Sequence, residues 1–207
     1  MNASRDAGED AWAKLASSDP GEVAARALVG FDAAAGKFVV EVLGRSIFVH
    51  PERGLVEGAD DEASALLERR SDLLPTILVH YLVGASDAPL AGRLVTPSSV
   101  RGGDMFCRGT HALPLDRLAE AYLGVPEKFV ERGLELGGRK VDHGDVAVEL
   151  RPVPRVPVLV AFWDGDEEFP PRASVFFDAS CEAHLSGDVL WAAATICVRE
   201  MFPSGTC

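Results

Sequence analysis

The segment Trp163–Pro171, with the sequence WDGDEEFPP, is the richest in groups that could do chemistry. Crowded carboxylates raise one another's pKa, and they can hold a hard divalent cation or act as general acid and base. The candidate metal ligands are Asp164, Asp166, Glu167 and Glu168. An EF-hand is excluded, because Phe169 stands where its sharp turn needs glycine. The alternative is a solvated hairpin loop with Trp163 and Phe169 packed at its base.

A second segment, Gly102–His111, combines flexible glycines with a cation, a thiol and an imidazole, and it ends just before a predicted helix. Free N–H groups at a helix N-terminus favour an anion, which Arg108 and His111 could meet. The alternative is an ordinary loop in which His111 caps or packs. A two-Cys, two-His zinc site is a further alternative, at spacings that are common by chance. Its ligands would be Cys107, His111, Cys181 and His184.

Other motifs are weaker. Gly30–Lys37 superficially resembles a phosphate-binding loop, but its glycine spacing is one residue too long and a strand follows in place of a helix. The chain has no G-x-S-x-G elbow of a serine hydrolase. His80 lies in an apolar helical stretch and is predicted to be a core residue. His50 and His143 stand beside turns and are predicted to be exposed.

The chain has 207 residues, 47% of them hydrophobic, and a formal net charge of -12. This is enough apolar surface for a core, and the negative charge makes nucleic acid and anionic membrane surfaces poor partners. No apolar run approaches the roughly 20 residues that a membrane span requires, and no signal-peptide pattern opens the chain. The four cysteines are scattered without C-x-x-C spacing, which favours reduced thiols and a cytoplasmic location.

Hydrophobic periodicity predicts the elements that must position these groups. A period of two over 38–42 and 46–50 predicts a β-hairpin. The continuously apolar run 158–163 predicts a central strand, with its partner at 173–178, and alternation predicts a further strand at 146–151. Helices are predicted over 60–70, 74–84, 114–124, 126–137 and 187–201. Together they predict one α+β domain over residues 10–203, with a mainly antiparallel or mixed sheet and helices packed on it. Disordered or short tails are predicted at 1–9 and 204–207.

Several short motifs occur in a characteristic order along the chain. They include Gly102-Gly103, Leu136-Gly137-Gly138, Pro154-Arg155-Val156-Pro157, Trp163–Pro170 and Phe177-Asp178-Ala179-Ser180. With this order the chain, from about Trp12 to Phe202, resembles the bacterial and archaeal family known as domain of unknown function 3786. The resemblance implies a cytosolic protein, mostly of anaerobic organisms, with little established biochemistry. Some members carry a cysteine-rich iron–sulfur segment, and this chain lacks such a run.

Three functions follow as hypotheses. In the first, the chain is an accessory or binding protein that takes a small anionic ligand or cofactor between the Gly102–His111 and Trp163–Phe169 loops. Arg108 and His111 would meet the anion, and Trp163 and Phe169 would offer aromatic faces. In the second, the Asp164–Glu168 carboxylates bind a divalent metal in a hydrolase or lyase. In the third, the acidic loop docks a basic protein. The sequence specifies no cofactor, no reaction and no oligomeric state.

Overall fold

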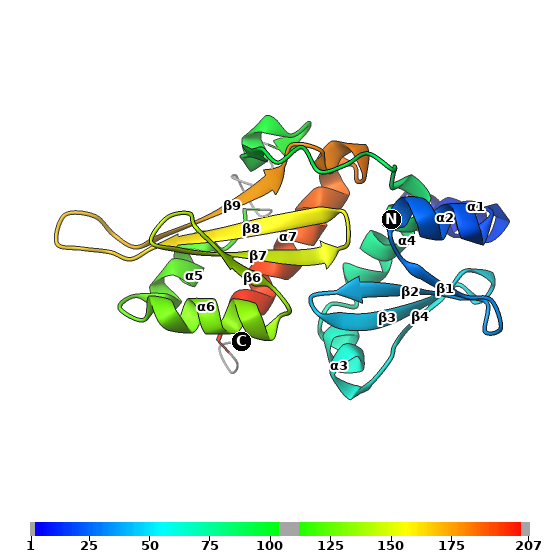
Figure 1. The fold of residues 1–207 in the computed structure, drawn as a ribbon, viewed down its shortest axis with the longest axis horizontal. Coiled ribbons are helices and arrows are strands. Elements are labelled where there is room, and N and C mark those ends of the chain that lie inside the picture. The colour runs from blue at the N-terminus through cyan, green and yellow to red at the C-terminus, as the bar shows by residue number, and fades with distance from the viewer. Residues whose placement is uncertain (1–2, 104–111, 204–207) are drawn as a thin grey trace.

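A computed structural model describes residues 3–103 and 112–203 of the chain. In these residues seven α-helices and two antiparallel sheets form an α+β fold (Figure 1), as the sequence predicted. One sheet is built from the N-terminal half of the chain and the other from the C-terminal half, so the strands predicted for one sheet are divided between two. No helix within these two ranges is long and apolar enough to cross a membrane.

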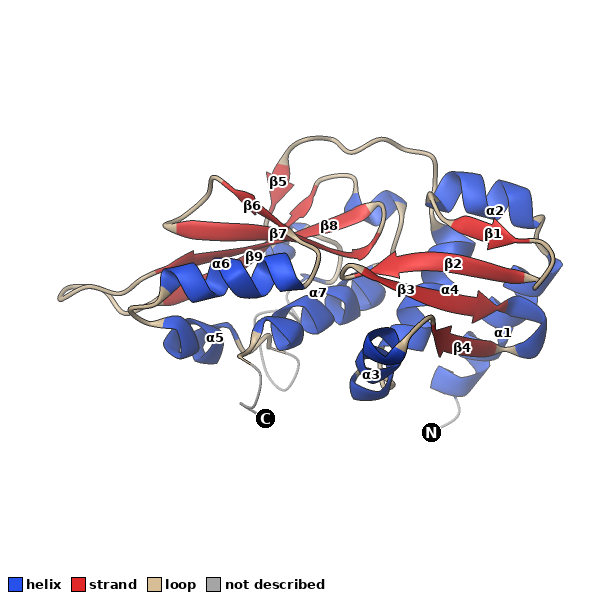
Figure 2. Cartoon of the chain, turned by 60° about the horizontal axis from the view of Figure 1, so that its bottom comes forward, coloured by secondary structure: helices blue, strands red, loops and turns tan. Residues whose placement is uncertain are grey.

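The N-terminal sheet has the strand order β1-β2-β3-β4, with helices α1–α4 around it (Figure 2). The predicted hairpin is confirmed, since β2 and β3 pair antiparallel and Phe38, Val40 and Val42 alternate into the core. Helix α1 begins at Ala3, within the residues 1–9 for which the sequence predicted a tail. The elements are α1 (Ala3–Ser17), α2 (Pro20–Ala27), β1 (Gly30–Asp32), β2 (Lys37–Val42), β3 (Arg45–His50), η1 (Pro51–Arg53), β4 (Leu55–Gly58), α3 (Asp61–Arg69) and α4 (Leu74–Gly84).

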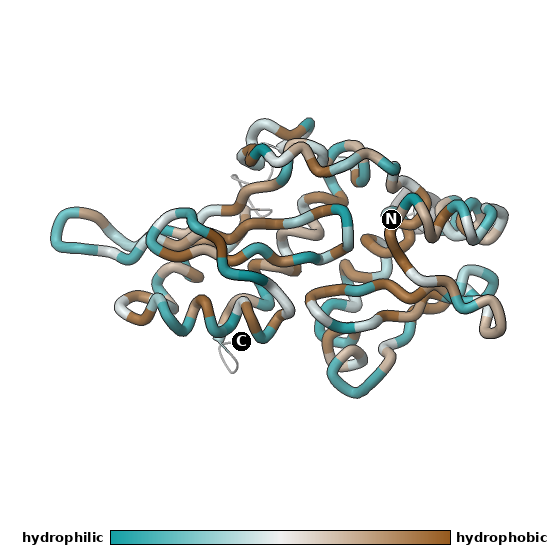
Figure 3. Tube along the Cα trace, in the orientation of Figure 1, coloured by the Kyte–Doolittle hydropathy of each residue, from teal (hydrophilic) through white to brown (hydrophobic). Residues whose placement is uncertain are grey.

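The C-terminal sheet has the order β5-β9-β8-β7-β6. The predicted central strand is confirmed as β8, buried on both faces, and Figure 3 shows the hydrophobic residues concentrated along such strands. Val158, Val160 and Phe162 belong to the main core, whereas Leu159 and Ala161 form a small cluster on the other face. The elements are β5 (Leu94–Val95), η2 (Pro97–Ser99), α5 (Leu115–Tyr122), α6 (Pro126–Glu135), β6 (Arg139–Val141), β7 (Val146–Val153), β8 (Val156–Trp163), β9 (Arg172–Asp178), η5 (Cys181–Ala183) and α7 (Gly187–Met201).

The two sheets meet at the turn between β2 and β3. Leu43 and Gly44 both have a positive φ, 49° and 73°, and the Leu43 N–H donates to the Arg151 carbonyl at 2.9 Å. Gly44 lies directly against Gly137, whose φ is also positive, at 69°. A Cβ atom on Gly44 would come within 2.9 Å of the Gly137 Cα atom, which real structures do not tolerate. Glycine is therefore required on both sides of this contact.

A buried tyrosine, Tyr81, adds polar contacts between the two halves of the chain. The Tyr81 hydroxyl on α4 donates to the Ala27 carbonyl at 2.6 Å and accepts the Arg155 N–H at 3.1 Å. The Arg155 guanidinium in turn donates to the Arg26 carbonyl at 2.6 Å. Burial raises the pKa of Tyr81 to about 12, so the hydroxyl stays a donor at neutral pH. These bonds tie the β7–β8 turn to α2 and α4.

The buried carboxylate of Glu200 also links helices from the two halves of the chain. The Glu200 side chain on α7 is only 2% exposed, and it accepts bonds from Arg70 at 2.7 Å and Arg69 at 3.0 Å. Arg132 on α6 lies 3.8 Å away and donates to the Glu200 carbonyl at 2.8 Å. A buried charge requires such partners, because desolvation is costly. Glu200 thereby connects the end of α3 with α6 and α7.

The close contact between glycines predicts an unequal response to the same substitution. Gly137→Ala should lower the free energy of unfolding by about 3 kcal/mol, because the methyl group meets the Gly44 backbone and the positive φ is strained. Gly36→Ala is the matched control: its φ is also positive, at 62°, but nothing lies within 4 Å of the added atom. It should cost only about 1 kcal/mol. Urea denaturation measures both, and equal losses would contradict the proposed contact.

Candidate functional site

The two ends of the β8–β9 hairpin have different neighbours. Trp163 closes β8 and pairs with Arg172 at one end of the hairpin, while Asp178 closes β9 at the other, close to η5. The backbone of Arg101, just before the Gly102–His111 segment, contacts η5 and the start of α7. Arg108 and His111, like Cys107, lie outside the described residues, so their role stays a prediction.

The acidic loop is fixed by its own carboxylates. Asp166 Oδ1 accepts the N–H groups of Glu168 and Phe169, both at 2.8 Å. Asp164 Oδ1 accepts the Gly124 N–H at 2.9 Å, which attaches the loop to the α5–α6 turn. Two of the four predicted metal ligands thus cap backbone groups, and Glu167, like Glu168, is exposed. Among residues 3–103 and 112–203, no group of three or more candidate ligands could hold a metal ion, so the metal hypothesis gains no support there.

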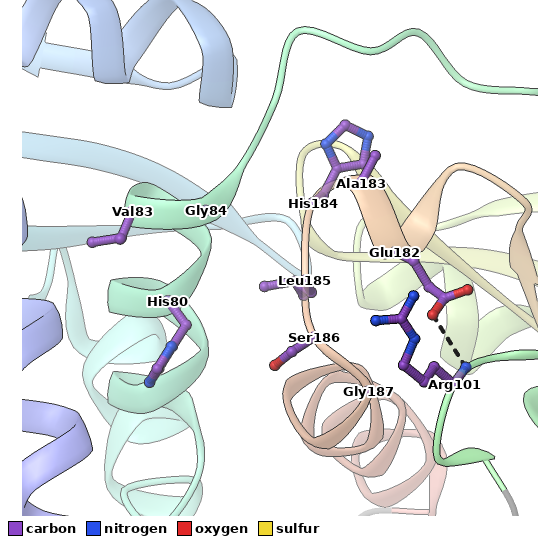
Figure 4. A pocket seen from close by; sticks show the side chains of 10 residues that line it. All are labelled: His80, Val83, Gly84, Arg101, Glu182, Ala183, His184, Leu185, Ser186 and Gly187. Carbon is purple, nitrogen blue, oxygen red and sulfur yellow. Dashed lines mark hydrogen bonds between the residues drawn. The ribbon is translucent and has the colours of Figure 1, made fainter.

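A cavity of about 400 Å³, which we call the helix-end pocket, lies between the C-terminal end of α4 and the N-terminal end of α7. Figure 4 shows Leu185 and Ser186 pointing toward α4, and a hydrogen bond of 3.1 Å from the Arg101 N–H to the Glu182 carboxylate. The walls of the helix-end pocket come from both halves of the chain. They are His80, Val83, Gly84, Arg101, Glu182, Ala183, His184, Leu185, Ser186 and Gly187.

The N-terminus of α7 presents unbonded donors to this pocket. α7 has 15 residues, and its helical bonds begin with the Leu190 N–H to the Ser186 carbonyl at 2.8 Å. The preceding N–H groups have no partner inside the helix, and the Ser186 side chain does not cap them. With the helix dipole they favour a negative charge. The exposed Arg101 side chain adds a positive charge, opposed by Glu182.

His184 is the buried polar group in the wall of the pocket. The residue is 1% exposed, and both ring nitrogens lack a hydrogen-bond partner among the described residues. Burial lowers its pKa, Arg155 lowers it further, and Asp178 acts in the opposite direction. The ring is therefore neutral at neutral pH, with one donor and one acceptor nitrogen. A buried polar group without a partner costs about 1–3 kcal/mol, and neither ring nitrogen is open to the space of the pocket.

The surroundings of Cys181 disfavour the thiolate form that a zinc ligand needs. Burial, followed by the charge of Glu182, raises the pKa of its thiol to about 11. Zinc binds the thiolate, which this environment disfavours. The zinc alternative also depends on Cys107 and His111, which lie outside the described residues.

A second cavity of about 630 Å³ lies beside the acidic loop, and we call it the hairpin pocket. The Arg172 guanidinium lies over the Trp163 ring, 4.2 Å from its centre. Phe169 is 67% exposed, so it does not pack at the base of the loop as the alternative interpretation of the sequence expected. The remaining walls are Asp116, Asp145, Asp164, Asp166, Pro170 and Pro171.

Sequence reasoning missed most of the helix-end pocket. His80 was predicted to lie in the core, yet it is partly exposed and lines the pocket. His50 was predicted to be exposed, but it is 7% exposed and bonded to Glu57 at 2.9 Å. Arg101 was passed over, although it directly precedes the Gly102–His111 segment. The signal available in the sequence was Ser186, which marks the start of a long helix beside His184.

Comparison with protein-family models matches residues 19–200 to the domain of unknown function DUF3786. No curated protein and no solved structure matches the chain.

The buried imidazole predicts a pH dependence of stability. A lowered folded pKa means that the contribution of His184 is complete above its unfolded value of about 6.5 and is lost as the pH falls toward the folded pKa. Between about pH 7.5 and pH 5.5 carboxylates stay ionised, so the wild-type loss over this range should shrink in His184→Leu. His143→Gln, which replaces a partly exposed histidine, should lose as much stability over this range as the wild type does. Urea denaturation at both pH values tests this, and identical wild-type and His184→Leu profiles would refute it.

Proposed function

The chain belongs to the DUF3786 family, and we propose that it is a binding protein whose helix-end pocket takes a small ligand carrying a carboxylate or phosphate group. The observation that carries the proposal is the uncapped N-terminus of α7 at a pocket whose wall also holds the exposed Arg101 side chain and the buried His184. An anion there would meet donors that the described residues otherwise leave unused.

The expected contacts follow from the lining. The backbone N–H groups at the start of α7 would receive one face of the anion, as helix N-termini do in many phosphate sites. The Arg101 guanidinium would add a charge-assisted bond, and the Ser186 hydroxyl is free to donate as well. The proposal therefore keeps the small anionic ligand that the sequence predicted. Arg101 is the positively charged residue, among those the structure describes, that would contact it.

The size of the pocket favours a small metabolite. Ligand sites commonly measure about 300–1,000 Å³, and the helix-end pocket lies near the lower end of that range. Glu182 limits how much negative charge the pocket accepts, because it places one carboxylate on the wall. A ligand with a single anionic group and an apolar portion against Val83 and Leu185 fits this lining best.

An accessory role in the cytoplasm completes the proposal. Cys181 and Cys197 are buried free thiols, which suits a reducing compartment. The lining offers groups that bind and orient an anion.

Arg101→Gln should weaken anion binding about tenfold, because one charge-assisted hydrogen bond is lost and Glu182 is left unopposed. Inorganic phosphate and acetate are the probes, titrated in a zwitterionic buffer. Backbone amide NMR shifts of Gly187, Asp188 and Val189 report binding and give the dissociation constant.

Arg93→Gln is the matched control, because Arg93 is equally exposed and lies outside the pocket. It should leave the dissociation constant unchanged. The proposal fails if neither probe moves these amides, or if both arginine variants bind as the wild type does.

A further inference from the structure

The loop between β8 and β9 projects beyond the body of the molecule (Figure 1) and forms a structured tip. Strand pairing ends at Trp163 and Arg172, so residues 164–171 lie outside the sheet. Within the loop the Asp166 N–H donates to the Phe169 carbonyl at 2.9 Å, and Asp166 Oδ1 accepts two N–H groups in return. A tight turn therefore presents the Phe169 side chain outward.

An exposed phenylalanine on such a turn is unusual. Phe169 is the most exposed large hydrophobic residue in the described chain, at 67%. Pro170 and Pro171 continue its apolar surface into the hairpin pocket. Prolines fix the backbone, so this surface is ordered before any partner arrives and little conformational entropy is lost on contact.

The indole at the base of the loop is held in place on several sides. Arg172 covers one face, at 4.2 Å from the ring centre, and the His143 ring meets Trp163 edge-on at 5.9 Å. A Cβ atom on Gly144 would come within 3.0 Å of the indole, so the 142–145 loop packs directly against it. The hairpin pocket thus has a rigid aromatic base.

The charge around this surface is predominantly negative. Four aspartates line the hairpin pocket against a single arginine, which is stacked on Trp163. The exposed Glu167 and Glu168 extend the negative charge to the tip. Asp145 Oδ2 accepts the Asp164 N–H at 2.8 Å, so backbone groups hold Asp145 as they hold Asp164 and Asp166. A fixed negative rim around an apolar surface is complementary to alternating basic and apolar side chains.

We propose that the hairpin pocket and the Phe169 tip dock a basic, partly apolar segment of a partner protein. The pocket continues onto a projecting tip that exposes Phe169, a surface that suits an extended segment of a partner protein. A lysine or arginine of the partner lies among the aspartates, and its apolar neighbour covers Phe169 and Pro170. The chain's net charge of -12 accelerates the encounter. This surface is separate from the helix-end pocket, and the two sites share no residue.

A labelled peptide tests the docking surface directly. The probe is an amidated fluorescent peptide in which lysine and leucine alternate, and its charge-reversed counterpart has glutamate in place of lysine. Fluorescence anisotropy should detect binding of the lysine peptide only, and the affinity should fall as salt rises because exposed charges are screened.

Two pairs of variants assign the binding to the hairpin. Phe169→Ala should weaken it about tenfold, whereas Leu134→Ala, at a 51% exposed leucine on α6, should not. Asp116→Asn should weaken it about threefold, whereas Asp61→Asn removes the same charge from the first turn of α3 without effect. Equal binding of both peptides, no binding up to millimolar concentration, or no effect of Phe169→Ala overturns the proposal. Binding of phenethylamine as tight as that of the peptide overturns it too, because the ligand would then be a small cation.

Discussion

The contact between Gly44 and Gly137 constrains how the two sheets can be assembled. Both residues have a positive φ, and neither leaves room for a side chain. Because the backbones touch there, the β2–β3 turn lies close enough to β7 for the Leu43 N–H to reach the Arg151 carbonyl. Tyr81 and Glu200 then fix α4 and α7 on either side. The main core continues through this joint from one half of the chain to the other.

The helix-end pocket is a consequence of that joint. One wall is the end of α4, which packs with the N-terminal helices, and the other is the start of α7, which packs on the C-terminal sheet. Neither half of the chain could form the pocket alone, and a ligand in it contacts both. The hairpin pocket, in contrast, belongs to the C-terminal half and lies at the far end of β8 and β9. A ligand at the first site can therefore bind without obstructing a partner at the second.

Local patterns predicted the elements well, because they depend on neighbours in the sequence. The alternation around Val40 predicted the hairpin, and the apolar run ending at Trp163 predicted the central strand β8. The division into two sheets was not predictable, because it depends on contacts between residues far apart, such as Gly44 and Gly137. For the same reason His80 appeared to be a core residue, although the end of its helix borders a pocket. The acidic loop was recognised from its composition, but its role as a set of backbone caps depends on three-dimensional geometry.

The most direct test of the anion site is the pKa of the His184 imidazole, measured by NMR with and without inorganic phosphate. Burial holds this pKa below its usual value in the free protein. A bound anion beside the ring favours the charged imidazolium, so phosphate should raise the pKa of His184. The ring resonances of His143, which lies against Trp163, should not move when phosphate is added at constant pH. A pKa of His184 that phosphate does not alter would contradict the proposed site.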